Sequence, residues 1–170
     1  MGEGIGGAST CLLVATGGAI LSYIPAGNIA SKIGRRKTIM AGVVLLASCF
    51  LLGGIIMNNA TSITIVMYLI FALVGLAWAA INVNSLPMVV EMCKGSEVGK
   101  FTGYYYTFSM AAQVITPIVA GTLLRNVGYK ILFPYAAFFV ACAFVTMSMV
   151  RHGDNKVEAK KGLDAFDMDD

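Results

Sequence analysis

Uncharged and mostly apolar residues fill four long stretches of this chain, and short polar segments separate the stretches. Residues 4–31, 38–90, 101–124 and 131–150 contain no Asp, Glu, Lys, Arg or His. A helix needs roughly 20 apolar residues to cross a hydrocarbon core about 30 Å thick. The second stretch is long enough for two crossings joined by a polar turn at 58–62, so the pattern predicts five membrane-spanning helices.

The predicted fold is therefore all-α and integral to a membrane. Because the connections are short, consecutive spans are expected to be antiparallel neighbours. Residues 1–150 are expected to form a transmembrane domain, and the mixed-charge segment 151–170 a disordered tail on the cytoplasmic side. The predicted spans cover residues 9–31, 38–57, 63–90, 101–124 and 131–150.

Composition supports a membrane protein and argues against other classes. Hydrophobic residues make up 58% of the chain and charged residues 12%, about half the usual charged share of roughly 25% in soluble domains. A net charge of +3 is too small to indicate a nucleic-acid partner. The four cysteines form no CxxC pair and lie near no histidine, so we interpret them as small apolar packing residues and predict neither a metal site nor a cofactor.

Lys and Arg are distributed unevenly between the two sides that the five spans define. Only Arg125 and Lys130 fall on one side. Because cytoplasmic loops are enriched in Lys and Arg, we expect the other side, including the C-terminus, to be cytoplasmic in a multi-pass protein of the cell membrane. The residues on that side are Lys32, Arg35, Arg36, Lys37, Lys94, Lys100, Arg151, Lys156, Lys160 and Lys161.

The connection at residues 27–37, between the first two spans, is the most distinctive local segment. Gly27 is expected to let the end of one helix pack closely on its neighbour. Gly34 is expected to permit the tight reversal of the chain, since glycine takes a positive φ without steric cost. The basic residues that follow are expected to meet negative lipid headgroups, at about 1 kcal/mol per charge.

This segment resembles the cytoplasmic loop signature of the major facilitator superfamily, Gly-x-x-x-Asp-Arg/Lys-x-Gly-Arg-Arg/Lys. It departs from the signature at Ser31, where the family prefers Asp. That departure, and the four spans that follow, are typical of the weaker second copy between helices eight and nine. The matching residues are Gly27, Lys32, Gly34, Arg35 and Arg36.

Three further segments, 80–91, 103–113 and 132–137, resemble the sucrose/proton symporter-like branch of that superfamily. The resemblance implies a twelve-helix fold of two six-helix halves that exposes a central site alternately to each side. This chain would supply helices eight to twelve, a partial C-terminal half. The partners implied are the lipid bilayer, the missing N-terminal helices, and a sugar or glycoside carried with a proton.

Uncharged polar side chains in the third and fourth spans are the candidates for a solute cavity. On a helical wheel they form one stripe on each span. We interpret the stripes as hydrogen-bonding walls of a cavity, with contacts between helices as the alternative. The candidates are Trp78, Asn82 and Ser85 on the third span and Tyr106, Ser109 and Gln113 on the fourth.

Two other functional classes stay open at this point. A small polytopic subunit that folds only with partner chains would also be apolar and uncharged within its spans. A membrane enzyme is less well supported, because no predicted span holds the His, Asp or Glu that such chemistry needs. The leading prediction is therefore part of a transporter that is not an enzyme.

Overall fold

The chain forms five long helices in the computed structural model, which describes residues 5–59 and 65–153. Each helical stretch is long and apolar enough to cross a membrane. No strand occurs within the described ranges, and the predicted all-α fold with five transmembrane helices is confirmed. The helices are α1 (Ile5–Ile33), α2 (Arg35–Asn59), α3 (Ile65–Val90), α4 (Val98–Val127) and α5 (Leu132–Met149), with short 3-10 turns at Gly95–Glu97 and Tyr129–Ile131.

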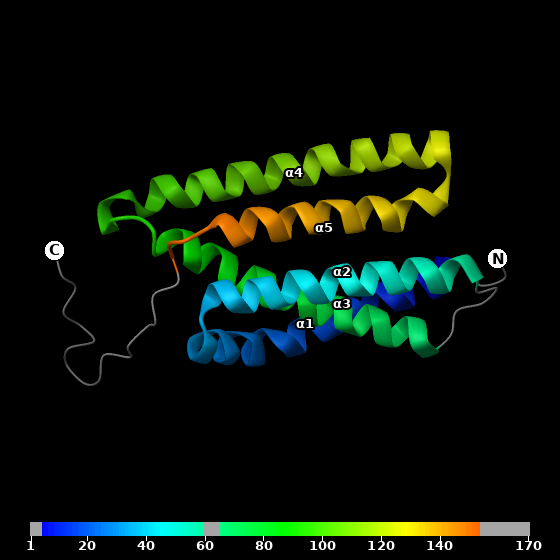
Figure 1. Cartoon of the computed structure of the whole chain (residues 1–170), viewed down its shortest axis with the longest axis horizontal. Coiled ribbons are helices and arrows are strands. Elements are labelled where there is room, and N and C mark those ends of the chain that lie inside the picture. Colours follow the sequence, from blue (N-terminus) through cyan, green and yellow to red (C-terminus); the bar gives the residue numbers. More distant parts are fainter. Residues whose placement is uncertain (1–4, 60–64, 154–170) are drawn as a thin grey trace.

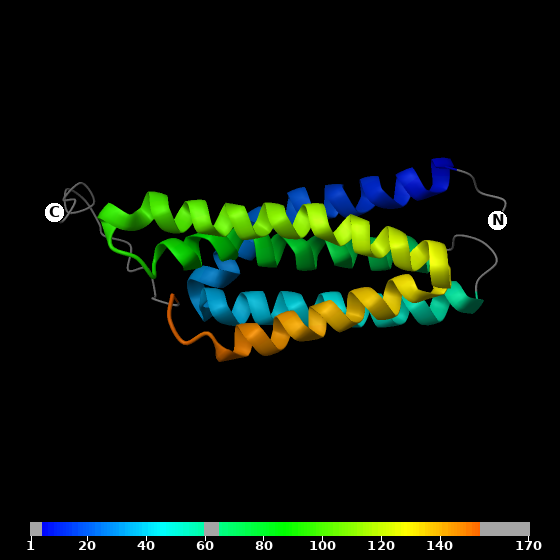
Figure 2. The ribbon, with the colours of Figure 1, turned by 90° about the horizontal axis from the view of Figure 1, so that it is seen from above.

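Successive helices run in opposite directions along one long axis (Figure 1). The α1–α2 connection, the end of α3, the start of α4 and the end of α5 lie together at one end of the bundle (Figures 1 and 2). We call it the basic end, because it holds seven of the nine basic side chains in the described ranges. These are Lys32, Arg35, Arg36, Lys37, Lys94, Lys100 and Arg151, while Arg125 and Lys130 flank the α4–α5 turn.

The five helices differ in how extensively they pack against one another. The closest association joins α1 to α3, and α2 packs against both α3 and α5. By contrast, α4 makes only sparse contact with α3 and has no buried residue. Figure 1 shows α4 along the outer edge of the bundle, so the rest of the described chain leaves most of its surface uncovered.

Small residues set the close approach of α1 to α3. A Cβ atom built on Gly75 would overlap the backbone carbonyl of Ala15 and lie 2.8 Å from the nitrogen of Ala19. A Cβ atom on Gly18 would lie 3.0 Å from the carbonyl oxygen of Ala72. Without a hydrophobic force between helices in lipid, such contacts let backbones gain van der Waals attraction.

The expectation for Gly27 is wrong. A Cβ atom there would meet the nearest side-chain atom, on Val83, at 3.8 Å, which is an ordinary contact. The tight contact between α1 and α3 lies at Gly75 rather than near the end of α1, so Gly27 has room for a side chain. The expectation for Gly34 is confirmed, because its φ is 99° and it alone separates α1 from α2.

The basic connection is shorter than the sequence pattern indicated. Lys32 lies in the last turn of α1, and Arg35 to Lys37 form the first turn of α2 rather than a loop. Lys and Arg are good helix formers, and their long stems let the charges reach water while the backbone stays helical. Helices also continue through Pro25, Pro87 and Pro117.

Two predicted features lie partly or wholly outside the described residues. The polar turn at 58–62 falls across the end of α2 and the gap at 60–64, and most of the tail predicted for 151–170 lies beyond residue 153. The division into a membrane domain over 1–150 and a disordered tail over 151–170 stays a prediction.

Candidate functional site

The candidate residues of α3 lie in one stripe along the C-terminal half of the helix. Trp78 is 53% exposed, and its backbone carbonyl accepts a hydrogen bond of 3.0 Å from the Asn82 amide. One turn further, the Ser85 hydroxyl donates to the carbonyl of Ile81 at 2.6 Å. The Asn82 amide and the Ser85 hydroxyl therefore each donate a hydrogen bond to a backbone carbonyl of their own helix.

Two of the three candidate residues of α4 are exposed. Gln113 donates to the Ser109 hydroxyl at 3.3 Å, again within one helix, and its side chain is exposed. The Tyr106 ring is exposed too and meets the neighbouring Tyr105 ring edge-on, with centroids 5.3 Å apart. Each of these hydrogen bonds lies within a single helix, and among the described residues none bridges the α3 and α4 stripes.

Asn84 is the polar residue of α3 that the helical-wheel reasoning missed. It is only 2% exposed, and its amide donates to the carbonyl of Ala80 at 2.8 Å. It shares a buried face with Ala77, Ala80 and Met88, at spacings of three and four residues. That spacing was the available signal: Asn84 falls on the small-residue face, whereas Asn82 falls on the other.

Charged side chains tie three helices together at the basic end. Arg35, at the start of α2, forms an ion pair and hydrogen bond with Glu91, just after α3. Both side chains are only about a fifth exposed, at 22% and 20%. Arg36 donates to the backbone carbonyl of Ser148 near the end of α5, at 2.6 Å. The cluster of these four residues is called the helix-end cluster below.

The loop motif makes its charged contact without an acid at position 31. Ser31, in the place of the acid, is exposed and donates to the carbonyl of Asn28 at 2.8 Å within α1. Glu91 supplies the carboxylate for Arg35 instead. Glu91 directly follows the third predicted span and so falls on the same side as the basic residues, but the sequence does not say which of them it meets.

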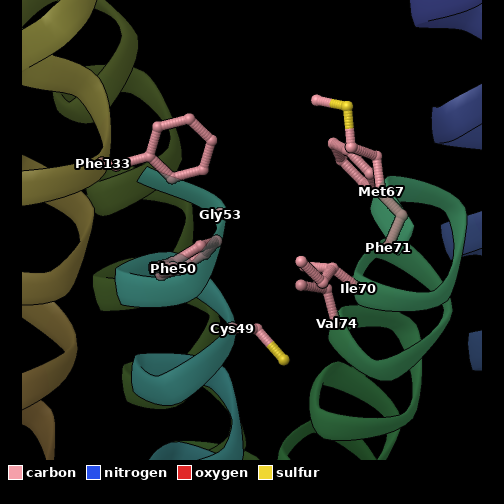
Figure 3. A pocket seen from close by; sticks show the side chains of 8 residues that line it. All are labelled: Cys49, Phe50, Gly53, Met67, Ile70, Phe71, Val74 and Phe133. Carbon is pink, nitrogen blue, oxygen red and sulfur yellow. The ribbon is translucent and has the colours of Figure 1, made fainter. Parts of the chain in front are cut away.

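A small pocket lies between α2, α3 and α5, towards the end opposite the helix-end cluster (Figure 3). It holds about 30 Å³ of free space, and only apolar surface lines it. An apolar space of this size stays dry and offers a hydrophilic solute no hydrogen bond. The lining residues are Cys49, Phe50, Gly53, Met67, Ile70, Phe71, Val74 and Phe133.

Cys49 supports the reading of the cysteines as packing residues. Its side chain is buried and reaches this pocket among aromatic and aliphatic groups (Figure 3). In the part of the chain that the structure describes, no three His, Cys, Asp or Glu side chains gather as metal ligands would.

Comparison with known proteins gives a consistent assignment. The family model described as Major Facilitator Superfamily matches residues 3–165. The MFS-type transporter ppzB of Metarhizium rileyi is 24% identical over 143 residues, which is 84% of this chain and 28% of that protein. The uncharacterized protein YqgE of Bacillus subtilis is 27% identical over 141 residues, 80% of this chain and 32% of that protein.

A third relative, an uncharacterized protein in the sodM 3′ region of Geobacillus stearothermophilus, is 27% identical over 127 residues. The match covers 72% of this chain and 58% of that protein. The chain thus spans about a third of the length of the first two relatives. Five apolar helices and a family match over nearly the whole sequence lead to one assignment: this chain belongs to the major facilitator superfamily of membrane transporters.

Proposed function

We propose that the chain is part of the C-terminal half of a secondary active transporter that moves a sugar or glycoside together with a proton. The observation that carries the proposal is the uncharged polar stripe of α4, with Tyr106 and Gln113 exposed on a helix that has no buried residue. Beyond its bond to Ser109, an exposed Gln at membrane depth has a second N–H and a carbonyl oxygen that need hydrogen-bonding partners. A watery cavity shared with helices outside this chain would provide one.

The chemistry of the stripes favours a neutral, hydroxyl-rich solute. Asn and Gln amides and Ser and Tyr hydroxyls both donate and accept hydrogen bonds, as sugar hydroxyls do. Within residues 101–124 no charged side chain is present to bind an ionic solute. A coupling carboxylate for the proton would therefore come from helices that this chain does not contain.

Substrate binding tests the stripes directly. In the full-length transporter, Asn82→Ala and Gln113→Ala are each expected to weaken sugar binding several-fold, because one lost hydrogen bond is worth about 1 kcal/mol. Ser48→Ala and Ser148→Ala are the controls, because both hydroxyls lie on α2 and α5, outside the polar stripes of α3 and α4. The measurement is the equilibrium affinity for a panel of radiolabelled sugars.

Substrate protection separates a cavity wall from a helix contact. Cysteines placed at 82 and 113 should lose reactivity towards a thiol reagent when the sugar is bound, whereas cysteines at 48 and 148 should not. Wild-type affinities for the alanine variants, together with no protection at 82 or 113, would show that both stripes are packing elements.

The segregation of basic residues supports a cytoplasmic basic end. A membrane-impermeant thiol reagent applied to intact cells is therefore expected to miss Cys93, which lies between α3 and α4 at that end. The same reagent should label a cysteine introduced at position 59, at the far end of α2. Permeabilising the cells should make Cys93 reactive. Labelling of Cys93 in intact cells, with protection of position 59, would reverse the orientation.

A further inference from the structure

An apolar groove runs between α1 and α2 on the half of the bundle next to the basic end. It holds about 170 Å³ of free space. Pro25, Ile29 and Ile33 line it from α1, Thr38 and Leu45 from α2, and Leu76 of α3 lies at its floor. The groove exists because α1 and α2 make few contacts with each other and both pack against α3.

The walls of this groove suit hydrocarbon rather than a hydrophilic molecule. Its two hydroxyl groups are occupied: Ser22 donates to the carbonyl of Gly18 at 2.6 Å, and Thr38 to that of Gly34 at 2.9 Å. Ile29 and Ile33 are about half exposed, at 50% and 48%. In a bilayer these side chains would face the acyl chains of lipid.

Two lysines adjoin the lining residues of the groove at the basic end. Its last residues, Ile33 and Thr38, are sequence neighbours of Lys32 and Lys37. Both lysines are exposed, and neither has a carboxylate partner among the described residues. The nearby arginines are already engaged by α3 and α5, which leaves the two ammonium groups for an external anion.

From this arrangement we propose that the groove is a binding site for an anionic phospholipid of the leaflet at the basic end. The phosphate would lie between Lys32 and Lys37 and one acyl chain would lie along the groove. In a phospholipid the charged headgroup lies at the membrane surface and the hydrocarbon lies deeper. The lysines at the basic end and the apolar groove follow the same order along the membrane normal. Each lysine near the surface of an anionic bilayer contributes attraction of its own. The proposal does not depend on which solute the transporter carries.

The test is a lipid titration of the purified full-length protein in detergent, followed by native mass spectrometry. Phosphatidylglycerol and phosphatidylcholine with identical oleoyl chains are the two probes. Phosphatidylglycerol is expected to bind more tightly, and Lys32→Gln/Lys37→Gln should weaken it by about tenfold or more. Lys94→Gln/Lys100→Gln removes the same charge at the same end away from the groove and should change the affinity little.

A second arm tests whether the acyl chain occupies the groove. Ala41→Phe, at an exposed position that lines the groove, should also weaken phosphatidylglycerol binding, whereas Leu51→Phe on the far half of α2 should not. A photoactivatable acyl chain should crosslink to Ile29 and Ile33. Monodisperse elution on size exclusion is required of every variant.

Three results would overturn the proposal. One is an equal loss of phosphatidylglycerol binding in Lys32→Gln/Lys37→Gln and Lys94→Gln/Lys100→Gln, because the attraction would then be general to the basic end. Another is full binding by Ala41→Phe without crosslinks in α1, which would place the lipid on the surface alone. The third is equal affinity for the two lipids in the unmodified protein.

Discussion

Gly75→Ala is expected to cost the protein roughly 3 kcal/mol of stability or more, the upper part of the range for overpacked interiors. The added methyl group would overlap the carbonyl oxygen of Ala15, and a backbone atom cannot move aside as a flexible side chain can. Relief requires α1 and α3 to separate along their closest contact. The measurement is the midpoint of thermal unfolding of the purified protein in detergent.

Gly17→Ala is the matched control for this substitution. Gly17 lies on α1, and a Cβ atom there would meet nothing within 4 Å. Its midpoint should stay unchanged or rise slightly, because alanine is the better helix former. Gly18→Ala should fall between the two, since its contact with Ala72 is tight at 3.0 Å without overlapping. A Gly75→Ala midpoint equal to that of Gly17→Ala would contradict the described α1–α3 interface.

Arg35→Gln is expected to destabilise the basic end by roughly 2–3 kcal/mol, because it leaves the Glu91 carboxylate largely buried without its counter-charge. The second carboxylate oxygen of Glu91 is buried and has no hydrogen-bond partner within the described chain. No hydrogen bond to that oxygen therefore compensates the Glu91 carboxylate for the loss of Arg35. The unfolding midpoint and protease susceptibility near residues 91–97 measure the effect.

Two further variants decide whether the pair is the cause. Lys100→Gln removes one positive charge at the same end, from an exposed pair with Glu97 at 3.7 Å, and should cost less than about 0.5 kcal/mol. Arg35→Gln/Glu91→Gln should recover most of the stability lost in Arg35→Gln, since no unpaired charge remains. Equal effects of the two single variants, or no recovery in the double variant, would refute the described ion pair.

Much of the fold could be predicted from one property, the spacing of charged residues. A charge at membrane depth is costly and a helix must cross the whole hydrocarbon core, so uncharged stretches of sufficient length report the number of helices. The loop signature added the expectation of the major facilitator superfamily, and the family match bears that out. The assignment to a sugar/proton symporter and the six cavity candidates remain proposals.

The candidate site was less accessible to the same reasoning. Helical wheels that group polar residues do not say which face meets another helix; on α3 the spacing of the small residues was the better signal. Asn82 and Asn84 are chemically identical and two residues apart, and the structure buries only the second among Ala77, Ala80 and Met88.

The sequence by itself determined that this is a membrane protein and how many helices span the bilayer, because both depend on hydrophobicity. It also determined the chain reversal at Gly34, which depends on local backbone freedom. Only the tertiary structure decided that Gly75 rather than Gly27 is the point of closest helix approach. It alone paired Arg35 with Glu91, at the ends of two different helices. Such contacts depend on the rotation and crossing point of each helix. In lipid, where most helix faces are apolar, shape complementarity between distant segments sets both.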